Sequence, residues 1–229
     1  MEISGKTAIV TGAASGIGLG IATALAEAER RFGKLHIACN NAGVPMRGTR
    51  LVDVPVADWA FVIGVNVWGV IHGIRHFVPA ILKHGEAGHV VNTASVAATQ
   101  NRRGTDQGPY SMTKYAVLSL SEALEHELEG TNVGVTALCP GPVATNLAQG
   151  ARHRPDHLGG PELRPAAEAV MAERLARSGI DPDLVGDRVI DAIRNKTFYA
   201  FVSAVPADVI RARHRRIETE LETRWTTPY

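Results

Sequence analysis

The chain has 229 residues, of which 45% are hydrophobic, and its formal net charge is +1. This length suffices for one domain with a substantial core, and the near-neutral charge argues against nucleic acid or an anionic membrane surface as a partner. The start has no apolar signal region, and the longest apolar run, residues 60–71, is too short to span a bilayer, so we expect a cytoplasmic protein with no membrane partner.

Residues 7–11 form an apolar run that predicts a strand, and a glycine-rich turn follows it. The spacing of Gly12, Gly16 and Gly18 suits a tight turn from a strand into a helix, where the backbone approaches a pyrophosphate group at the helix N-terminus. Such spacing alone is weak evidence for a dinucleotide site. A helix is predicted over residues 17–28, and it continues through residues 29–33.

A second strand ends in the sequence Asn40-Asn41-Ala42-Gly43, and a loop over residues 44–54 follows. Asp58 is expected to cap a long helix that carries Asn66, with a bend near Pro79. The next strand, residues 88–95, ends at Ser95. Ligands of open α/β sheets bind at the carboxyl ends of the strands, so Ser95 is a candidate site residue. We expect the loop over residues 96–108 to line the substrate.

Tyr110 and Lys114 lie four residues apart in a helix predicted from about residue 109 to residue 129. Residues at this spacing share one face of a helix. A phenol titrates near ~10, but an ammonium group about 5 Å away favours the phenolate by roughly 3 kcal/mol, which lowers the phenol pKa by about two units. Tyr110 would then serve as a general acid or base, and Ser95 would donate a hydrogen bond to the same substrate oxygen. Taken alone, the Tyr110–Lys114 pair fits a solvent-exposed helix equally well.

The last third of the chain begins with a strand over residues 132–139. The spacing of His153 and His157 is compatible with a metal site, but Pro155 between them and the lack of a third ligand favour a solvated loop. Asp181 and Pro182 predict the start of a helix. Residues 197–203 predict the last strand.

The tail from residue 206 is predicted to be helical, with a basic cluster followed by acidic residues. Basic runs bind phosphate groups or nucleic acid, but this one is short and promptly neutralised, so a solvated amphipathic helix is favoured; its arginines are Arg211, Arg213, Arg215 and Arg216. The two cysteines, Cys39 and Cys139, show no metal-ligand spacing and are expected to be reduced thiols in the core.

Taken together, five local patterns in this order resemble the short-chain dehydrogenase/reductase family over nearly the whole chain. They are the glycine-rich turn, the Asn40–Gly43 pattern, Asn66, the Ser95–Tyr110–Lys114 set, and residues 140–145. The resemblance implies an α/β fold of three layers, a doubly wound (Rossmann-like) parallel sheet, formed as one domain over residues 1–229. It also implies a variable lid over the substrate at about residues 146–182. The function that it implies is that of an oxidoreductase that moves a hydride between NAD or NADP and a secondary alcohol or ketone.

The resemblance further implies roles for individual residues. Tyr110 would exchange a proton with the substrate oxygen, Lys114 would lower the Tyr110 pKa and bind the nicotinamide ribose, and Ser95 would hold the substrate oxygen. Asn66 would position a water in a proton relay. The implied catalytic residues are thus Asn66, Ser95, Tyr110 and Lys114, and the implied cofactor-binding residues are Gly12, Ser15, Gly16, Ile17, Gly18, Asn40, Asn41, Ala42, Gly43, Tyr110, Lys114, Pro140, Gly141, Val143 and Thr145.

The chain departs from this family after the first helix. In this fold an acidic or basic residue that contacts the adenosine ribose is expected roughly 20 residues after the glycine-rich turn. Counted from Gly18, that position is Ala38, which lies inside the next predicted strand. Strands two and three of the family are therefore expected to be missing at Ala28/Glu29, leaving about five strands and strand one as an exposed edge. The crossover from strand one would then be left-handed, which is rare. Two explanations stay open: the polypeptide lacks the segment, or a segment of the natural protein is missing from the sequence at this join.

The cofactor preference is poorly determined without the second strand. Ser15, where many NADP-preferring members carry a basic residue, is neutral, which favours NAD weakly. The helix of Tyr110 and the long helix before it form the subunit interface in the family, so a homodimer or homotetramer is expected. The alternative function is a non-catalytic binding or oligomerising protein, which would follow if the cofactor-binding segment is truly absent.

Overall fold

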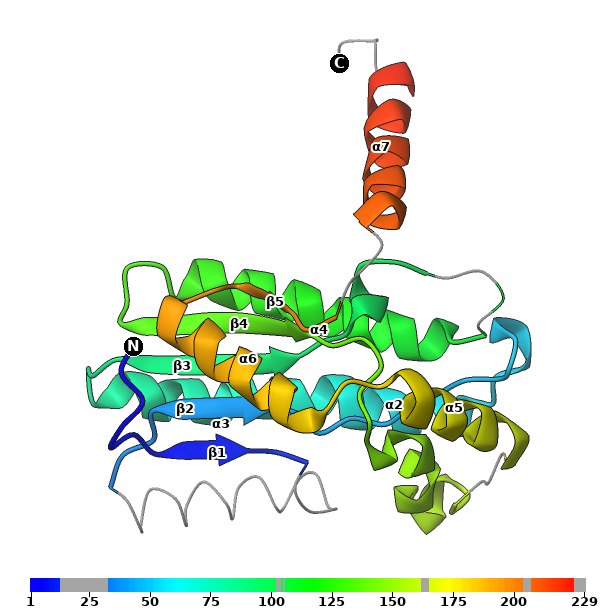
Figure 1. Ribbon diagram of the computed structural model, residues 1–229, viewed down its shortest axis with the longest axis horizontal. Helices are drawn as coiled ribbons and strands as arrows, with labels where there is room; N and C mark the ends of the chain where they lie inside the picture. Colours follow the sequence, from blue (N-terminus) through cyan, green and yellow to red (C-terminus); the bar gives the residue numbers. More distant parts are fainter. Residues whose placement is uncertain (13–32, 102–103, 105, 162–164, 204–206, 225–229) are drawn as a thin grey trace.

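A single parallel sheet forms the centre of the protein. The computed structural model describes residues 1–12, 33–101, 104, 106–161, 165–203 and 207–224. Within them, five strands pair in parallel and lie in the sheet in the same order as in the sequence (Figure 1). They are β1 (Ala8–Val10), β2 (Ile37–Asn40), β3 (Gly88–Thr93), β4 (Val133–Cys139) and β5 (Tyr199–Phe201). This confirms the predicted Rossmann-like α/β class with about five strands.

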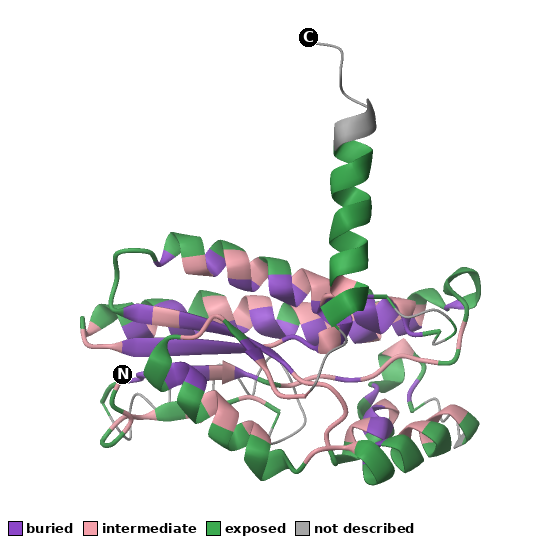
Figure 2. Cartoon of the chain, turned by 45° about the horizontal axis from the view of Figure 1, so that its top comes forward, coloured by how far each residue is buried: buried purple, intermediate pink, exposed green. Residues whose placement is uncertain are grey.

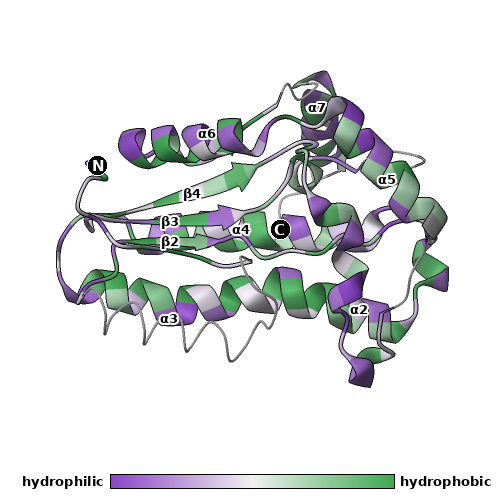
Figure 3. Cartoon of the chain, turned by 60° about the horizontal axis from the view of Figure 1, so that its bottom comes forward, coloured by the Kyte–Doolittle hydropathy of each residue, from purple (hydrophilic) through white to green (hydrophobic). Residues whose placement is uncertain are grey.

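Helices cover both faces of the sheet, as Figure 3 shows for α3 and α6 on opposite sides of β2, β3 and β4. One face carries α3 (Gly69–Lys83) and α4 (Gly108–Glu127), and the other carries α6 (Pro182–Asn195). The helix α2 (Val56–Ile63) continues into α3 through a five-residue π-helical segment, η2 (Gly64–Trp68). The helix α7 (Ala207–Arg224) projects away from the body. Short 3-10 segments complete the list: η1 (Leu51–Asp53), η3 (Val96–Ala98), η4 (Asn146–His153) and η5 (Asp156–Leu158).

The core follows from the alternation of side chains along each strand. Ala38 and Val90 pack with α3 and α4, whereas their neighbours Ile37 and Val91 pack with Ile193 of α6. Figure 2 accordingly shows buried strands between helices that are exposed on their outer sides. Strands buried on both faces read as continuous apolar runs, which is why sequence alone located them.

The first strand, β1, is an edge of the described sheet. It pairs with β2 on one side, and Val10 is 53% exposed. The prediction of an exposed first strand is thus confirmed for the described residues. The predicted helix over residues 17–28, its continuation to Gly33 and the join at Ala28/Glu29 lie mostly outside the described residues.

The segment from Val56 to Lys83 is one helical stretch of 28 residues that contains the predicted apolar run. Of the helices in the described residues, this one has a length and an apolar composition that would allow it to cross a membrane. In this structure 44% of its most apolar window is buried, and Phe77 and Ile81 are fully enclosed against the sheet. It therefore packs as a core helix of the domain.

Two local predictions about helices need correction, and one is confirmed. Asp58 does not cap α2: the N-cap is Pro55, and the Asp58 carboxylate instead pairs with Arg154 at 2.7 Å. The expected lid contains a regular helix, α5 (Pro165–Ser178), that was not predicted. Asp181 does cap α6, because its side chain accepts a hydrogen bond from the backbone of Asp183.

Candidate active site

The turn after β1 and the loop after β2 are held against each other. The Thr11 hydroxyl accepts hydrogen bonds from the backbone N–H groups of Asn41 and Ala42 at 2.9 and 3.2 Å. Gly12 has φ +90°, and a Cβ atom there would lie 2.9 Å from the Ala42 Cα atom. Only glycine fits this backbone and this approach. The other predicted residues of the turn, Ser15, Gly16, Ile17 and Gly18, lie outside the described residues.

Asn66 fixes the loop that follows β2. It lies in the π-helical segment η2 and is 1% exposed. Its Oδ1 atom accepts from the Val44 N–H at 2.8 Å, and its Nδ2 atom donates to the Val44 carbonyl and the Thr113 hydroxyl, each at 3.0 Å. Short π-helical segments are frequent at functional sites. Here the π-helical segment directs the buried Asn66 side chain toward both the loop after β2 and α4, and its hydrogen bonds hold the loop against the helix.

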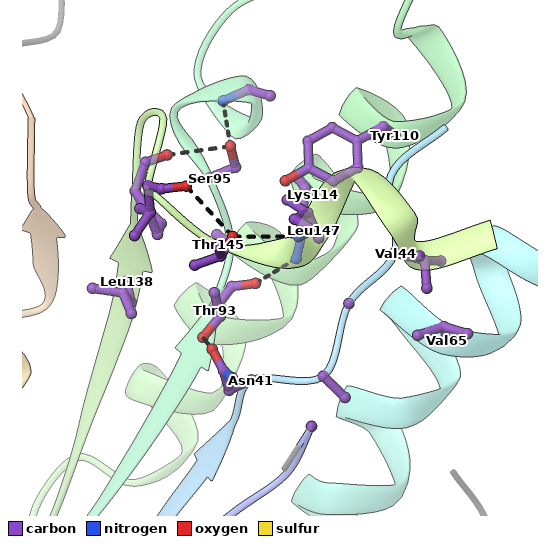
Figure 4. Close-up of a pocket in the computed structure, with 18 of the residues that line it drawn as sticks. Asn41, Val44, Val65, Thr93, Ser95, Tyr110, Lys114, Leu138, Thr145 and Leu147 are labelled. Atoms are coloured by element: carbon purple, nitrogen blue, oxygen red, sulfur yellow. Dashed lines mark hydrogen bonds between the residues drawn. The ribbon is translucent and has the colours of Figure 1, made fainter. Parts of the chain in front are cut away.

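Tyr110, Ser95 and Lys114 come together at the carboxyl ends of β3 and β4 (Figure 4). All three are buried, with 8%, 7% and 3% of their surfaces exposed. The Lys114 Nζ atom donates to the Thr93 carbonyl at 2.7 Å and lies 5.7 Å from the centroid of the Tyr110 ring. The Ser95 hydroxyl contacts the Pro140 carbonyl at 3.4 Å and accepts from the Ala97 N–H. The three groups predicted from sequence thus line one pocket.

Burial dominates the electrostatics of this group. It raises the pKa of the Tyr110 phenol, and a hydrogen bond from Ser95 and the charge of Arg47 oppose that shift. Burial lowers the pKa of Lys114 to about 8. The expected net lowering of the Tyr110 pKa by Lys114 is therefore not seen, because the ammonium group is aimed at the Thr93 carbonyl and is itself desolvated.

The Asn40 side chain lies away from the pocket that the other predicted residues line. It is 2% exposed, and its Nδ2 atom donates to Asn92 Oδ1 at 2.8 Å. Asn92 in turn donates to Ser121 on α4, and Ser121 donates to the Val117 carbonyl. Asn40 thus belongs to a buried hydrogen-bonded chain between the sheet and α4, and it is not among the residues that line the cavity.

The segment after β4 forms the opposite wall of the pocket. Pro140 accepts from the Val96 N–H at 3.0 Å, which ties this wall to Ser95. Gly141 leaves no room for a side chain, because a Cβ atom would lie 2.1 Å from the Ser203 hydroxyl. Val143 forms a bridge to Ile180, and Thr145 caps η4 by accepting from Leu147. All four predicted residues of this segment line the same cavity.

The cavity bounded by the described residues has a volume of about 1870 Å³. Pockets for one small ligand usually hold roughly 300–1,000 Å³, so this space is large enough for a dinucleotide together with a substrate. Gly12, Asn41, Ala42 and Gly43 line it, as do Ser95, Tyr110 and Lys114. The lining residue Gly12 packs directly against the backbone of Ala42, which holds the turn after β1 beside the loop after β2.

One group of possible metal ligands lies at the opposite end of the sheet: His36, His84 and Glu86. Their ring nitrogens are already engaged, since His84 contacts the Leu35 carbonyl and the Glu86 N–H, and His36 contacts Thr7 and Glu86. Glu86 also pairs with two lysines, Lys6 and Lys34. These positive charges disfavour a cation there. Among the described residues His153 and His157 belong to no such group, and His153 accepts from Arg152.

Sequence reasoning missed one residue of the site, Arg47. Its guanidinium carbon lies 5.8 Å from the centroid of the Tyr110 ring, and the Lys114 Nζ atom lies 5.7 Å from the same point. The signal was available, since Arg47 is the basic residue nearest to the Asn40–Gly43 pattern in the loop that follows it.

Comparisons with known proteins agree with this geometry. A family model described as short chain dehydrogenase matches residues 23–156. A 1-deoxy-11-beta-hydroxypentalenate dehydrogenase from Streptomyces avermitilis is 30% identical over 256 residues, covering 89% of this chain and 87% of the relative. A dehydrogenase/reductase of CLA biosynthesis from Lactiplantibacillus plantarum is 26% identical, covering 96% of this chain and 77% of the relative.

A solved short-chain dehydrogenase/reductase from Burkholderia phymatum, in complex with NAD, is 38% identical with a TM-score of 0.78. The match covers 92% of this chain but 74% of that one. The alignment with the Streptomyces relative, at 256 residues, exceeds the 229 residues of this chain. The relative therefore has residues without a counterpart here, in agreement with two missing strands. The fold, the buried Ser95–Tyr110–Lys114 group and these matches show that the chain belongs to the short-chain dehydrogenase family of NAD(P)-dependent oxidoreductases.

Proposed function

We propose that this protein interconverts a secondary alcohol and a ketone with a nicotinamide cofactor, and that Tyr110 is the general acid and base. The observation that carries the proposal is the buried group of Tyr110, Ser95 and Lys114 at the carboxyl edge of the sheet, inside a cavity large enough for both reactants. The nicotinamide cofactor, when bound, accepts or donates the hydride.

The protein's own residues handle the proton and the orientation. In alcohol oxidation, Tyr110 takes the hydroxyl proton as the carbon loses its hydride, and in ketone reduction it returns that proton to the oxygen. Ser95 donates a hydrogen bond to the same oxygen. The charge of Arg47 opposes the rise in the Tyr110 pKa and so stabilises the phenolate that the oxidation requires. The Lys114 Nζ atom lies 5.7 Å from the centroid of the Tyr110 ring.

The cofactor preference and the substrate class also belong to the proposal. NAD is favoured because Ser15 is neutral, and because the Burkholderia structure is described in complex with NAD. A secondary alcohol is favoured because the Streptomyces relative is named as a dehydrogenase of a hydroxylated compound. We propose a cytoplasmic homodimer or homotetramer without membrane or nucleic-acid partners; the exposed Trp68, Leu82 and Met112 of the η2–α3 and α4 region support self-association.

The test combines turnover with cofactor binding. A panel of secondary alcohols is offered with NAD and with NADP, and formation of the reduced nicotinamide is followed by absorbance. Tyr110→Phe is expected to abolish turnover and to leave the dissociation constant of the dinucleotide nearly unchanged. A Tyr110→Phe variant that keeps its activity would contradict the assignment of the acid and base.

A second candidate function rests on the edge position of β1. If the adenosine part of the cofactor site is lost with strands two and three, the protein would be a non-catalytic binding or oligomerising member of the family. The exposure of Val10 on that edge favours this candidate. Failure to bind either dinucleotide, with a folded protein, would decide in its favour.

A further inference from the structure

We propose that the substrate carries a carboxylate group and that Arg47 binds it beside Tyr110. This inference rests on the proposed function and adds the chemical class of the substrate: a secondary alcohol or ketone that is also a carboxylic acid. It starts from the charges that face the cavity.

The described lining of the cavity is positively charged. Its basic members are Arg47, Lys114, Arg152 and Arg174, with His72 and His153, and no aspartate or glutamate of the described residues lines it. The chain as a whole is balanced, with 24 basic and 23 acidic residues. The overall composition therefore does not explain why basic side chains line the cavity and acidic ones do not. A cavity lined by charges of one sign raises the local concentration of ligands of the opposite sign.

Arg47 lies at the reacting end of this cavity. Its guanidinium carbon is 5.8 Å from the centroid of the Tyr110 ring. Its Nε atom is buried and has no hydrogen-bond partner within the part of the chain that the structure describes. A buried donor without an acceptor is costly, and a guanidinium group binds a carboxylate through two parallel hydrogen bonds. A substrate carboxylate would supply the missing acceptor.

A second arginine approaches from the lid. Arg174 of α5 is close enough to lower the pKa of Arg47, although burial is the larger cause of that shift. The lid helix rests on the same loop, since a Cβ atom at Gly48 would lie 3.1 Å from the Ala167 side chain. Two positive charges from separate elements thus face one region without a carboxylate between them in the described structure. An anionic ligand would relieve their repulsion.

The position of Arg47 distinguishes this anion from the cofactor phosphates. The glycine-rich turn whose spacing suits a pyrophosphate begins at Gly12, which packs against Ala42 at the start of the loop. Arg47 comes five residues later and stacks on the ring of Tyr110. The charge is therefore placed at the substrate end of the cavity, next to the proton-transfer group.

The experiment compares acids with their uncharged esters. Mandelate and 3-hydroxybutyrate, in which the carboxylate lies close to the hydroxyl group, are each paired with their methyl ester, and kcat/KM is measured with the preferred dinucleotide for the wild type, Arg47→Met and Arg47→Lys. For the pair that the wild type oxidises faster, kcat/KM is expected to be higher for the acid than for its ester. Arg47→Met should reduce kcat/KM for the acid about 10- to 100-fold more than for the ester, the loss expected for a charged hydrogen-bonded pair. Arg47→Lys should recover part of the preference.

The matched control is Arg50→Met in the same loop. Arg50 is exposed, pairs with Asp53 at 2.7 Å and does not line the cavity, so the ratio of acid to ester should not change. Equal use of acid and ester by the wild type, or a preference that survives in Arg47→Met, would overturn the carboxylate site while leaving the oxidoreductase function in place. If no compound of the panel is oxidised, calorimetric binding of mandelate decides: binding lost in Arg47→Met supports the site, and no binding overturns it.

Discussion

The Nζ atom of Lys114 donates a hydrogen bond to the Thr93 carbonyl at 2.7 Å while lying 5.7 Å from the centroid of the Tyr110 ring. A buried backbone acceptor thus holds the ammonium group beside the phenol. Gly43 closes the same space, since a Cβ atom there would lie 3.5 Å from Lys114 Nζ and from Asn66 Oδ1. The loop after β2, the π-helical segment and α4 therefore converge on one buried charge.

The burial of Lys114 should make the unfolding free energy of the protein depend on pH in the alkaline range. The Lys114 pKa falls from the usual 10.5 to about 8 in the folded protein, so the unfolded chain binds more protons between those values and stability rises with pH. Relative to Lys114→Met, the unfolding free energy of the wild type should increase by about 3 kcal/mol across this window. Urea titrations of both proteins at a series of pH values measure the difference. A difference that is flat with pH would contradict the burial account.

Asn66 should be required to hold the loop after β2. Asn66→Ala removes one acceptor and two donors and leaves the Val44 backbone unpaired, which should lower the unfolding free energy by about 2–4 kcal/mol. Loss of the hydrogen bond from Val44 to Asn66 should appear specifically as faster hydrogen exchange of the Val44 amide. Asn195→Ala, an exposed position bonded only to Asp191 in the described structure, is the control and should cost less than about 0.5 kcal/mol. An unchanged Val44 exchange rate would argue against the clamp.

The ion pair of Arg154 and Asp58 should anchor the lid. The two side chains are 7% and 3% exposed and lie 2.7 Å apart, joining the end of η4 to the first turn of α2. Asp58→Ala leaves a buried guanidinium group without its partner and should cost about 3–5 kcal/mol, whereas the double replacement Asp58→Leu with Arg154→Met should cost much less. Denaturant unfolding measures both.

The exposed pair of Arg211 and Asp208 provides a comparison for this prediction. Their side chains are 66% and 92% exposed, so Arg211→Met should change the unfolding free energy by less than about 1 kcal/mol. Equal costs for the Asp58 and Arg211 variants would show that burial does not govern the lid pair.

His89 should make the protein sensitive to acid. It is fully buried in β3, its ring contacts the Thr136 hydroxyl at 2.7 Å, and burial lowers its pKa from 6.5 to about 4. The unfolded chain therefore takes up a proton first, and stability is lost as pH falls from 6.5 toward 4, by up to about 3 kcal/mol. His89→Leu should remove this part of the pH dependence, whereas His126→Gln, at an exposed position of α4, should retain it. Parallel slopes for His89→Leu and the wild type would contradict the assignment.

The sequence predicted the elements that periodicity and local chemistry determine. Strands such as β3 and β4 are continuous apolar runs, and the four-residue spacing of Tyr110 and Lys114 requires only a helix. Contacts between distant segments were not accessible in this way. The direction of Lys114 toward Thr93, the position of Arg47 over Tyr110, and the burial of Asn40 against Asn92 each depend on how the loop after β2 packs on α4.

Helix α5 of the lid and the ion pair of Asp58 and Arg154 were not predicted from the sequence either. Residues 165–178 have good helix formers, but the glycines and prolines that precede them are typical of a loop. The local sequence favours Asp58 as a helix cap, whereas its actual partner, Arg154, lies far away in the chain. Helix capping is local, whereas a buried ion pair is a tertiary contact.

We infer that this chain binds a nicotinamide dinucleotide next to Tyr110. Thermal unfolding in the presence of NAD, NADP or neither tests it most directly, since a ligand at 100 times its dissociation constant adds about 2.7 kcal/mol of stability. We predict a rise of several degrees in the melting temperature with one dinucleotide, retained in Tyr110→Phe. No change at millimolar concentrations of either dinucleotide would contradict the account and leave a member of the family that does not use its cofactor.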